Sequence, residues 1–177
     1  MNSRRCSIEN YIRAKDENRP DLLRHAFDVN ATAALTINTK NISFPGVLYG
    51  LPDISETLVR RFNQTYENIY TFCIGDAPLK RATSHTSRWL VGMSAKDSKE
   101  VRIGCGLYEW SFDSESGHVT YLHIRIDRMQ TGPVYELEPL MDWLRTLDYP
   151  WCEGRSLASQ APRLSALEDI LPYLASS

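Results

Sequence analysis

The sequence lacks the features that would place it in several large classes of protein. Its 177 residues contain no run of about 18 apolar residues, so no transmembrane helix is predicted. The four cysteines form no CxxC pair and are expected to be reduced thiols packed as small apolar groups. The four histidines show no HxH, HxxxH or HExxH spacing, which argues against a metal site. Walker, GxSxG and dinucleotide-binding glycine motifs are missing as well, so no cofactor is expected.

Strong charge of either sign is also missing. Twenty Lys and Arg against 22 Asp and Glu leave a formal net charge of −2, too little to draw the whole molecule onto a nucleic acid. The basic Arg4-Arg5 is followed by the polar Glu9-Asn10 and not by the apolar segment of a signal peptide. We therefore expect a cytoplasmic protein whose partners include neither nucleic acid nor a membrane.

What the sequence does contain is an ordinary globular composition and an early helical pattern. Apolar residues make up 42% and charged residues 24%, and the length suits one domain, or one domain with an appendage. Apolar residues recur every three or four positions between Ile8 and Phe27, but Pro20 interrupts them, which predicts a helical hairpin. A strand is predicted over Ala31–Phe44. A third helix follows Asp53, with Ile54, Leu58, Phe62 and Tyr66 on one stripe.

After Tyr66 the apolar period changes from about four to two, which is typical of strands. Four strands are predicted over Ile69–Gly75, Ala82–Ala95, Val101–Phe112 and Val119–Met129. Their polar connections, such as Asp97-Ser98-Lys99, suit hairpin turns, so the strands are expected to form an antiparallel meander.

The last 45 residues differ from the rest. From Pro133 to Ser177 there are three basic and seven acidic residues, a net charge of −4, which leaves +2 for the preceding chain. Leucines at helical spacing around Leu140 and again around Leu167 predict two amphipathic helices, separated by a linker over Ser156–Ser165. Their apolar faces must be covered, either by the sheet or the mouth of the same subunit or by a second copy.

This order of elements, together with three short sequence segments, resembles the nuclear transport factor 2-like superfamily. The opening segment Tyr11–Leu23 is similar to the family's aromatic helix, turn and leucine-rich second helix. Phe27–Thr32 resembles its passage into the first strand, and Tyr49–Ile54 resembles the start of its third helix. The resemblance covers residues 7 to about 129. The similarity is greatest to the SnoaL-like polyketide cyclase and ketosteroid-isomerase-like branch.

The resemblance implies an α+β, cystatin-like cone, in which a helical hairpin and a third helix pack in a strongly curved antiparallel sheet. We expect a cone domain over residues 7–130 and a C-terminal helical extension over 134–177. Relatives of this kind frequently dimerise through the outer sheet face, so a homodimer is expected, and the outward Leu107, Tyr121 and His123 are compatible with such an interface.

Two catalytic patterns of the superfamily can be compared with this chain. Ketosteroid isomerases stabilise an enolate with a tyrosine and a protonated aspartic acid, and a first-strand aspartate moves the proton. Tyr11 matches the tyrosine, and Tyr108 stands where the protonated acid would be. The base is missing, since only Asn38 lies near its position, so steroid isomerisation in the usual form is not expected. An epoxide-hydrolase relay would need inward carboxylates, whereas strand parity places Arg125 and Asp127 outward.

Strand parity also indicates which side chains face the interior. Tyr108, Trp110 and Phe112 share a face with Gly104 and Gly106, whose missing side chains suit strong curvature. On the preceding strand His85 shares a face with Trp89 and is expected at the rim of the cone. His85 is the best candidate for general acid–base work, although a rim histidine bonded to solvent or backbone is the simpler interpretation.

The aromatic residues support two hypotheses. In the first, the protein is a small-molecule-binding cone, and if it is an enzyme it is a cofactor-independent isomerase, cyclase or dehydratase of an apolar substrate. Tyr11, Tyr108 and His85 would be catalytic, and the pocket would be lined by Asn38, Phe44, Tyr49, Phe62, Tyr66, Trp89 and Trp110. In the second, the aromatics fill a solid core, and the protein is a non-catalytic dimerisation or protein-interaction module that uses the outer sheet and the helical tail.

Overall fold

The computed structural model describes residues 3–175, and a single mixed sheet organises them. The sheet has seven strands in the order β2-β1-β6-β5-β4-β3-β7. Most neighbours are antiparallel, but β1 pairs with β6 and β3 pairs with β7 in parallel. The strands are β1 (Phe27–Ile37), β2 (Val47–Tyr49), β3 (Tyr66–Ile74), β4 (Ser84–Ala95), β5 (Val101–Phe112), β6 (Val119–Gly132) and β7 (Trp151–Cys152).

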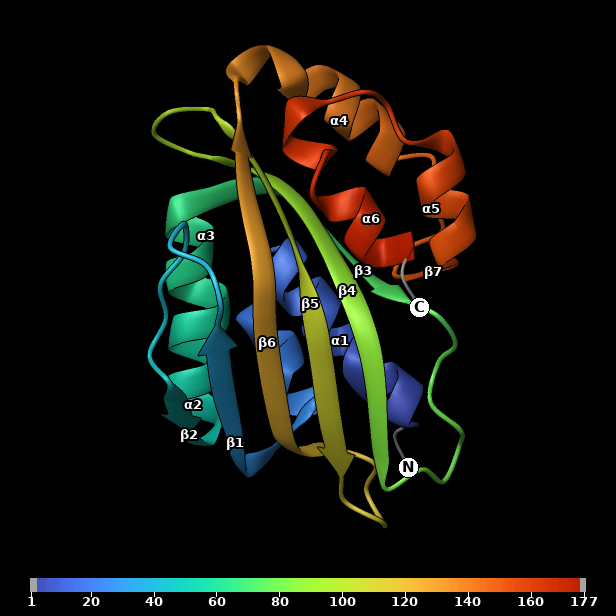
Figure 1. Ribbon diagram of the computed structural model, residues 1–177. Coiled ribbons are helices and arrows are strands. Elements are labelled where there is room, and N and C mark those ends of the chain that lie inside the picture. Colours follow the sequence, from blue (N-terminus) through green and yellow to red (C-terminus); the bar gives the residue numbers. More distant parts are fainter. Residues whose placement is uncertain (1–2, 176–177) are drawn as a thin grey trace.

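Helices cover both faces of this sheet (Figure 1). The inner face carries α1 (Arg4–Asp16), the 3₁₀ turn η1 (Pro20–His25) and a continuous helical stretch made of α2 (Gly50–Ser55), the π-helical η2 (Glu56–Arg61) and α3 (Phe62–Thr65). The outer face carries the C-terminal elements: η3 (Val134–Glu136), α4 (Leu137–Leu144), α5 (Gly154–Gln160), η4 (Ser165–Leu167) and α6 (Ile170–Ala175). No helix of residues 3–175 is long and apolar enough to cross a membrane.

The predicted fold class is confirmed, with differences at the element ends. The second helix of the hairpin is only a 3₁₀ turn, because Pro20 follows directly on the loop and six residues separate it from β1. The first strand begins at Phe27, four residues earlier than expected, and it ends at Ile37. Residues 38–44, which we expected to be strand, therefore belong to a loop that runs to residue 46. The segment 156–165, expected to be a linker, overlaps most of α5, whose Leu157 is fully buried.

The molecule has two hydrophobic cores, one on each face of the sheet. The inner core joins α1 and the 50–65 helical stretch to inward residues such as Trp89, Tyr108 and Ile124. The outer core joins outward residues of β3–β5, such as Phe72 and Leu90, to the tail. Burial of both faces explains why β4 ends in the unbroken apolar run Leu90–Met93, where an alternating pattern would be expected of a half-exposed strand.

Two glycines allow this packing. An added Cβ on Gly92 would lie 2.4 Å from Cδ1 of Leu144, so the glycine leaves the outer surface of β4 open for α4. An added Cβ on Gly106 would lie 1.8 Å from the backbone oxygen of Arg125, at a point where the β5–β6 register shifts. The bulge and the glycine together let β5 and β6 bend around the inner core, as the sequence suggested for Gly106.

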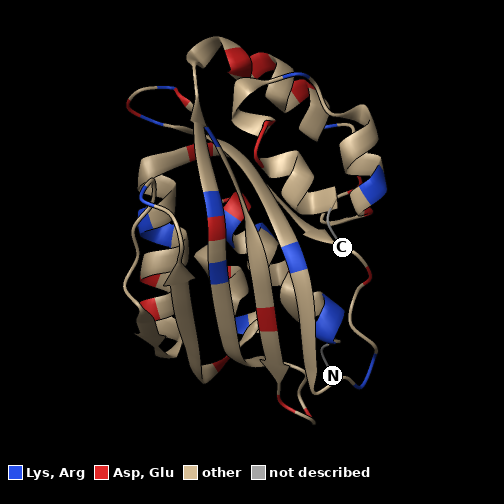
Figure 2. Ribbon diagram, viewed as in Figure 1, with Lys and Arg blue, Asp and Glu red and all other residues tan. Residues whose placement is uncertain are grey.

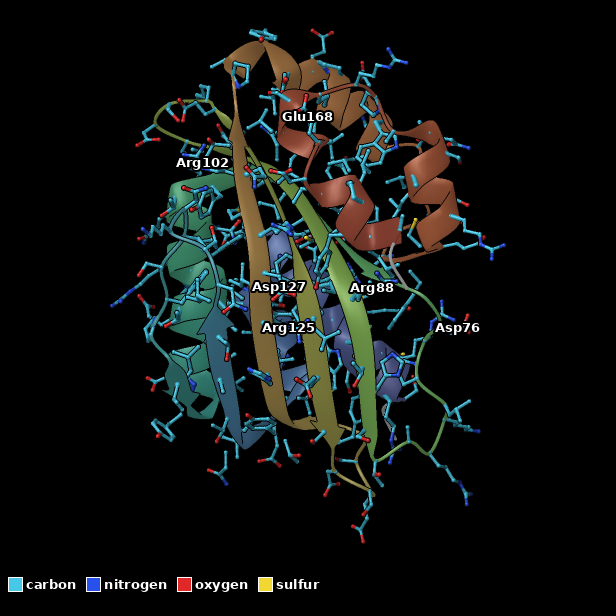
Figure 3. The ribbon with its side chains drawn as sticks, viewed as in Figure 1. Asp76, Arg88, Arg102, Arg125, Asp127 and Glu168 are labelled. Atoms are coloured by element: carbon cyan, nitrogen blue, oxygen red, sulfur yellow. The ribbon has the colours of Figure 1, made fainter. Side chains whose placement is uncertain are left out.

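The tail is fixed to the outer face by polar contacts as well as by leucines. Arg88 of β4 donates to the backbone oxygens of Tyr173 and Leu174 at 3.1 and 3.0 Å. The hydroxyl of Tyr173 hydrogen-bonds Asp127, which also forms an ion pair with Arg125 at 2.9 Å. Figure 3 shows Arg88, Arg125 and Asp127 together on this face. The sequence left two docking places for the tail within one subunit, the sheet or the mouth of the cone. In the structure the tail packs on the outer face of the sheet.

Candidate functional site

A small cavity, open at one side, lies between the helices of the inner face and the curved sheet. Its volume is about 40 Å³, room for one or two water molecules. Ten of its fourteen lining side chains are aliphatic, thioether or phenyl groups: Leu35, Ile42, Phe44, Leu58, Phe62, Val91, Met93, Ile124, Ile126 and Met129. The other four are Tyr11, Lys15, Trp89 and Tyr108, and they carry every polar side-chain group of the lining.

Helix α1 supplies two of these polar residues, Tyr11 and Lys15. They are four positions apart, so they lie one above the other on the same face of the helix. Their side chains point into the inner core, where Tyr11 is 1% and Lys15 6% exposed. Ile8 and Ile12 pack the same face and hold the helix against the sheet.

Tyr11 and Tyr108 form a hydrogen-bonded pair of hydroxyls in the cavity wall. Their ring centroids are 6.1 Å apart, and Trp89 stacks on Tyr108 at 5.5 Å. Burial raises the pKa of Tyr11 and the pKa of Tyr108 well above the ordinary value of a phenol. Both groups therefore remain protonated at neutral pH and can act as hydrogen-bond donors.

Lys15 joins the cavity to a buried polar network. Its Nζ lies 3.1 Å from Oδ1 of Asp16, and it also hydrogen-bonds the hydroxyl of Thr71. Asp16 accepts from the backbone N–H of Thr71 at 2.7 Å and from the hydroxyls of Thr71 and Tyr149 at 2.8 Å each. The charged pair is thus almost fully surrounded by hydrogen-bonding partners, as a buried ion pair requires.

Neither Lys15 nor Asp16 was predicted as a site residue. Both occur in the stretch Ala14-Lys15-Asp16-Glu17, which looks like the solvated end of a helix. One signal could have identified Lys15, namely its spacing of four from Tyr11. Asp16 gave no comparable signal, because its partners Thr71 and Tyr149 are 55 and 133 residues away.

Aromatic rings separate the cavity from a second, outer cleft. Phe44, in the loop after β1, stacks on Phe62 with centroids 6.4 Å apart, and Tyr66 contacts Phe62 at 5.0 Å. Phe44, Phe62 and Ile42 line both spaces, so they form the wall between them. The outer cleft has a volume of about 230 Å³ and is also lined by Tyr66 and Arg61.

Several predicted pocket residues lie elsewhere. Trp110 is buried, but it packs beyond Tyr11 and Tyr108 and does not line the cavity. Tyr66 lines the outer cleft only. Tyr49 is 71% exposed, because it ends the edge strand β2 on the outer side. Asn38 is exposed and donates to Asp127 at 3.0 Å on the outer face, since β1 ends at Ile37 and the chain turns away there.

His85 also lies away from the cavity. It pairs with Trp110 in the sheet, four residues before Trp89 on β4, and its ring packs 6.1 Å from that of Trp151. Burial lowers the pKa of His85, and its Nε2 has no hydrogen-bond partner among residues 3–175. The structure therefore brings Tyr11 and Tyr108 together and leaves His85 beyond the Trp110 layer.

The outer face also carries polar contacts around a histidine. His123 contacts the hydroxyl of Thr36 at 2.8 Å and Glu109 at 2.9 Å. Along the sheet, Figure 2 shows a stretch of β6 in which basic and acidic positions follow one another. Within the described part of the chain, no group of three or more His, Cys, Asp or Glu residues is arranged to hold a metal ion.

Comparisons with known proteins define the fold. No family model matches the chain, and no curated protein matches it. A nuclear transport factor 2-like protein of unknown function from Exiguobacterium sp. 255-15 shares 18% identity at a TM-score of 0.52, over 68% of this chain and 98% of that one.

Two further solved structures are similar. A hypothetical protein with a ketosteroid isomerase-like fold from Catenulispora acidiphila DSM 44928, in complex with trimethylamine, matches at 14% identity and a TM-score of 0.53, over 66% and 82% of the two chains. The structure of LinA matches at 8% identity and a TM-score of 0.56, over 70% and 83%. The chain therefore has the nuclear transport factor 2-like fold.

Proposed function

We propose that this protein binds a small, largely apolar molecule inside the cone, next to the Tyr11–Tyr108 pair. One observation carries the proposal: a cavity whose polar groups are confined to four side chains and whose remaining lining is apolar. Ligand sites are typically concave and apolar, with a few convergent polar groups that fix orientation. The Catenulispora acidiphila protein of similar fold was solved in complex with a small molecule, trimethylamine, which supports the proposal.

The ligand enters through the wall of Phe44 and Phe62. A cavity of about 40 Å³ is too small for a molecule of ten or so heavy atoms, so binding requires this wall to move. Phe44 belongs to the loop 38–46, which has no ladder partners over most of its length, and the outer cleft of about 230 Å³ beside it can take the displaced ring. Cone and cleft then become one elongated site.

If the bound molecule reacts, Tyr11 and Tyr108 are the residues that act on it, without a cofactor. Two protonated hydroxyls can stabilise a developing oxyanion, which suits isomerisation, cyclisation or dehydration of an apolar substrate. His85 has no role in this proposal, because it does not line the cavity. The solved structures of similar fold include a LEH-like epoxide hydrolase from M. tuberculosis and a hexachlorocyclohexane dehydrochlorinase (LinA) Type2, so proteins of this fold carry out different chemistries.

Binding can be tested with indane as a neutral apolar probe. Calorimetric titration should show saturable binding, and stopped-flow tryptophan fluorescence should show that the Phe44→Ala variant binds indane faster than the wild type, because the wall is removed. Tyr49→Ala is the matched control, since it removes an exposed aromatic residue that lies off the cavity. Absence of binding to both the wild type and Phe44→Ala would refute the proposal.

A second candidate function is pairing with another copy through the free part of the outer face. Tyr121 on β6 is 40% exposed, and Val47 and Tyr49 on the edge strand are 43% and 71% exposed, whereas the tail leucines are used within the outer core. Tyr121 and Tyr49 both pair with Thr32 of β1, so they share one row of the sheet. Sedimentation should give a dimer that Tyr121→Glu dissociates; a monomeric wild type would exclude this candidate.

A further inference from the structure

Three side chains on the outer face of the sheet form a series of hydrogen bonds that the proposed function does not use. They are Thr36 of β1, His123 of β6 and Glu109 of β5, from three neighbouring strands. Their sequence neighbours, such as Leu35 and Leu122, belong to the inner core, so all three point outward. The sheet separates this cluster from the cone, and its chemistry is therefore independent of any ligand in the cavity.

The cluster joins a hydroxyl, an imidazole and a carboxylate in that order. Nε2 of His123 lies 2.8 Å from Oγ1 of Thr36, and its Nδ1 lies 2.9 Å from Oε1 of Glu109. A carboxylate accepts hydrogen bonds and does not donate them, so the neutral imidazole has its proton on Nδ1. Nε2 is then the acceptor for the Thr36 hydroxyl. Glu109 thus fixes the tautomer in which the imidazole acts as a base toward Thr36.

The hydroxyl of this cluster is accessible to a substrate. Thr36 is exposed, whereas the His123 side chain between its two partners is 25% exposed. The outer core beneath the tail contains, among the described residues, none from β1. Ala34 precedes Thr36 by two positions on the same face, and its partner Val47 on β2 is 43% exposed. These two side chains offer a short acyl group an apolar surface beside the hydroxyl.

A positive charge lies next to the hydroxyl. Arg125 is the direct partner of Thr36 in the parallel β1–β6 pairing. Its Nε donates to both carboxylate oxygens of Asp127, at 2.9 and 3.0 Å, and its Nη2 lies 3.5 Å from the hydroxyl of Tyr173. The Arg125 side chain is still 38% exposed, and its Nη1 bonds no other group among residues 3–175. These N–H groups can donate to an oxyanion that develops on a carbonyl carbon at Thr36.

We propose that this cluster is an acyl-transfer site that moves a short acyl group from an activated ester to Thr36 and then to water. The Thr36 oxygen attacks the carbonyl carbon, and its proton moves to Nε2 of His123. The bond to the leaving phenol or alcohol breaks, and the leaving oxygen takes that proton. His123 next removes a proton from water, whose oxygen attacks acyl-Thr36. The carboxylic acid departs, and the Thr36 oxygen recovers the proton from His123.

The ester p-nitrophenyl acetate tests the proposal on the full chain. The wild type should release p-nitrophenolate over many turnovers, and acid quenching followed by peptide mass spectrometry should find the acetyl group on Thr36. Thr36→Val and His123→Gln should each slow turnover by about 100-fold or more, whereas Thr36→Ser should retain it. Thr86→Val is the matched control. Thr86 is exposed on the same face, opposite Glu109, but bonds no histidine within residues 3–175.

Two further variants test the groups around the hydroxyl and the imidazole. Arg125→Gln should slow turnover by about 100-fold, as the loss of an oxyanion donor does elsewhere. Glu109 is a positioning residue, because it touches the imidazole and not the substrate. Glu109→Ala should therefore lower kcat with little change in KM. Glu109→Gln should recover part of kcat, since its amide oxygen can still accept from Nδ1.

Several results would overturn the proposal. These are a wild type without turnover, turnover that persists in Thr36→Val, and acetyl groups found on lysines and the amino terminus alone. Turnover lost in His123→Gln but kept in Thr36→Val would also overturn it, because water and not Thr36 would then attack the ester. Circular dichroism and thermal melts establish that each variant is folded. Indane binding should be the same in all of them, so the two proposals stand or fall separately.

Discussion

Removing the Lys15 ammonium should destabilise the protein far more than removing an exposed cation of the same helix. In Lys15→Met the carboxylate of Asp16 remains buried, with a side chain 3% exposed, and loses the one cationic partner that it has among residues 3–175. Breaking a buried ion pair in this way costs about 3–5 kcal/mol. Asp16 keeps three hydrogen-bond donors from Thr71 and Tyr149, so we expect a loss near the lower end, about 3 kcal/mol.

Urea and thermal unfolding measure this loss. For a chain of this length, about 3 kcal/mol corresponds to a fall in Tm of roughly 6–12 °C. Arg5→Met is the matched control: Arg5 also pairs with a carboxylate, at 2.7 Å from Glu9, but its side chain is 60% exposed. That substitution should cost less than about 1 kcal/mol.

The double variant Lys15→Met/Asp16→Asn decides whether the uncompensated charge is the cause. It removes both charges and should be more stable than Lys15→Met alone. If Lys15→Met costs no more than Arg5→Met, or if the double variant is destabilised by the sum of the two single losses, the network around Asp16 does not depend on charge pairing and the reasoning is wrong.

Three further predictions concern thiols, pH and backbone geometry. Burial raises the pKa of Cys73 and the pKa of Cys105 to about 12, so about one thiol in ten thousand is ionised at pH 8. A thiol reagent should therefore label the exposed Cys6 rapidly and should label Cys73 and Cys105 only after unfolding. Because the pKa of His85 is lowered in the folded protein, the unfolded chain takes up a proton at this histidine at a higher pH than the folded chain does. The free energy of unfolding should therefore fall as pH drops below about 6.5, and the part of this fall that is due to His85 should vanish in His85→Gln. Gly106→Ala places a Cβ against the Arg125 carbonyl and should cost at least about 3 kcal/mol in urea unfolding, whereas Gly46→Ala, with no atom within 4 Å of its added Cβ, should cost little.

The main elements of this fold could be predicted because their signals are local. The change of apolar period at Tyr66 separates helix from strand, and β5 begins and ends where predicted, at Val101 and Phe112. Inward and outward sides follow from parity along each strand, which correctly placed Tyr108 inside and Asp127 outside. The end of β1 was not predicted, because Ile42-Ser43-Phe44 again alternate in polarity after the polar residues 38–41 and so resemble a continuation of the strand.

The candidate site could be predicted only in part, because its polar network depends on distant contacts. The inward position of Tyr11 and Tyr108 could be predicted from the family resemblance and from strand parity. Lys15 and Asp16 acquire their significance from Thr71 and Tyr149, which the sheet and the tail bring to them. A pattern of charges along one helix contains no information about which of them the rest of the chain will bury.

The tail links the two faces of the molecule. Tyr149 lies between α4 and β7, and its hydroxyl donates to Asp16, whose other partner Lys15 lines the cavity. Trp151 of β7 donates to Glu9 of α1 at 2.9 Å, so the same segment holds α1 at two points. The tail therefore does more than cover the outer leucines: it fixes the helix that carries Tyr11 and Lys15. Because these contacts reach the cavity through Asp16, substitutions at Tyr149 should alter ligand binding as well as stability, although Tyr149 itself does not line the cavity.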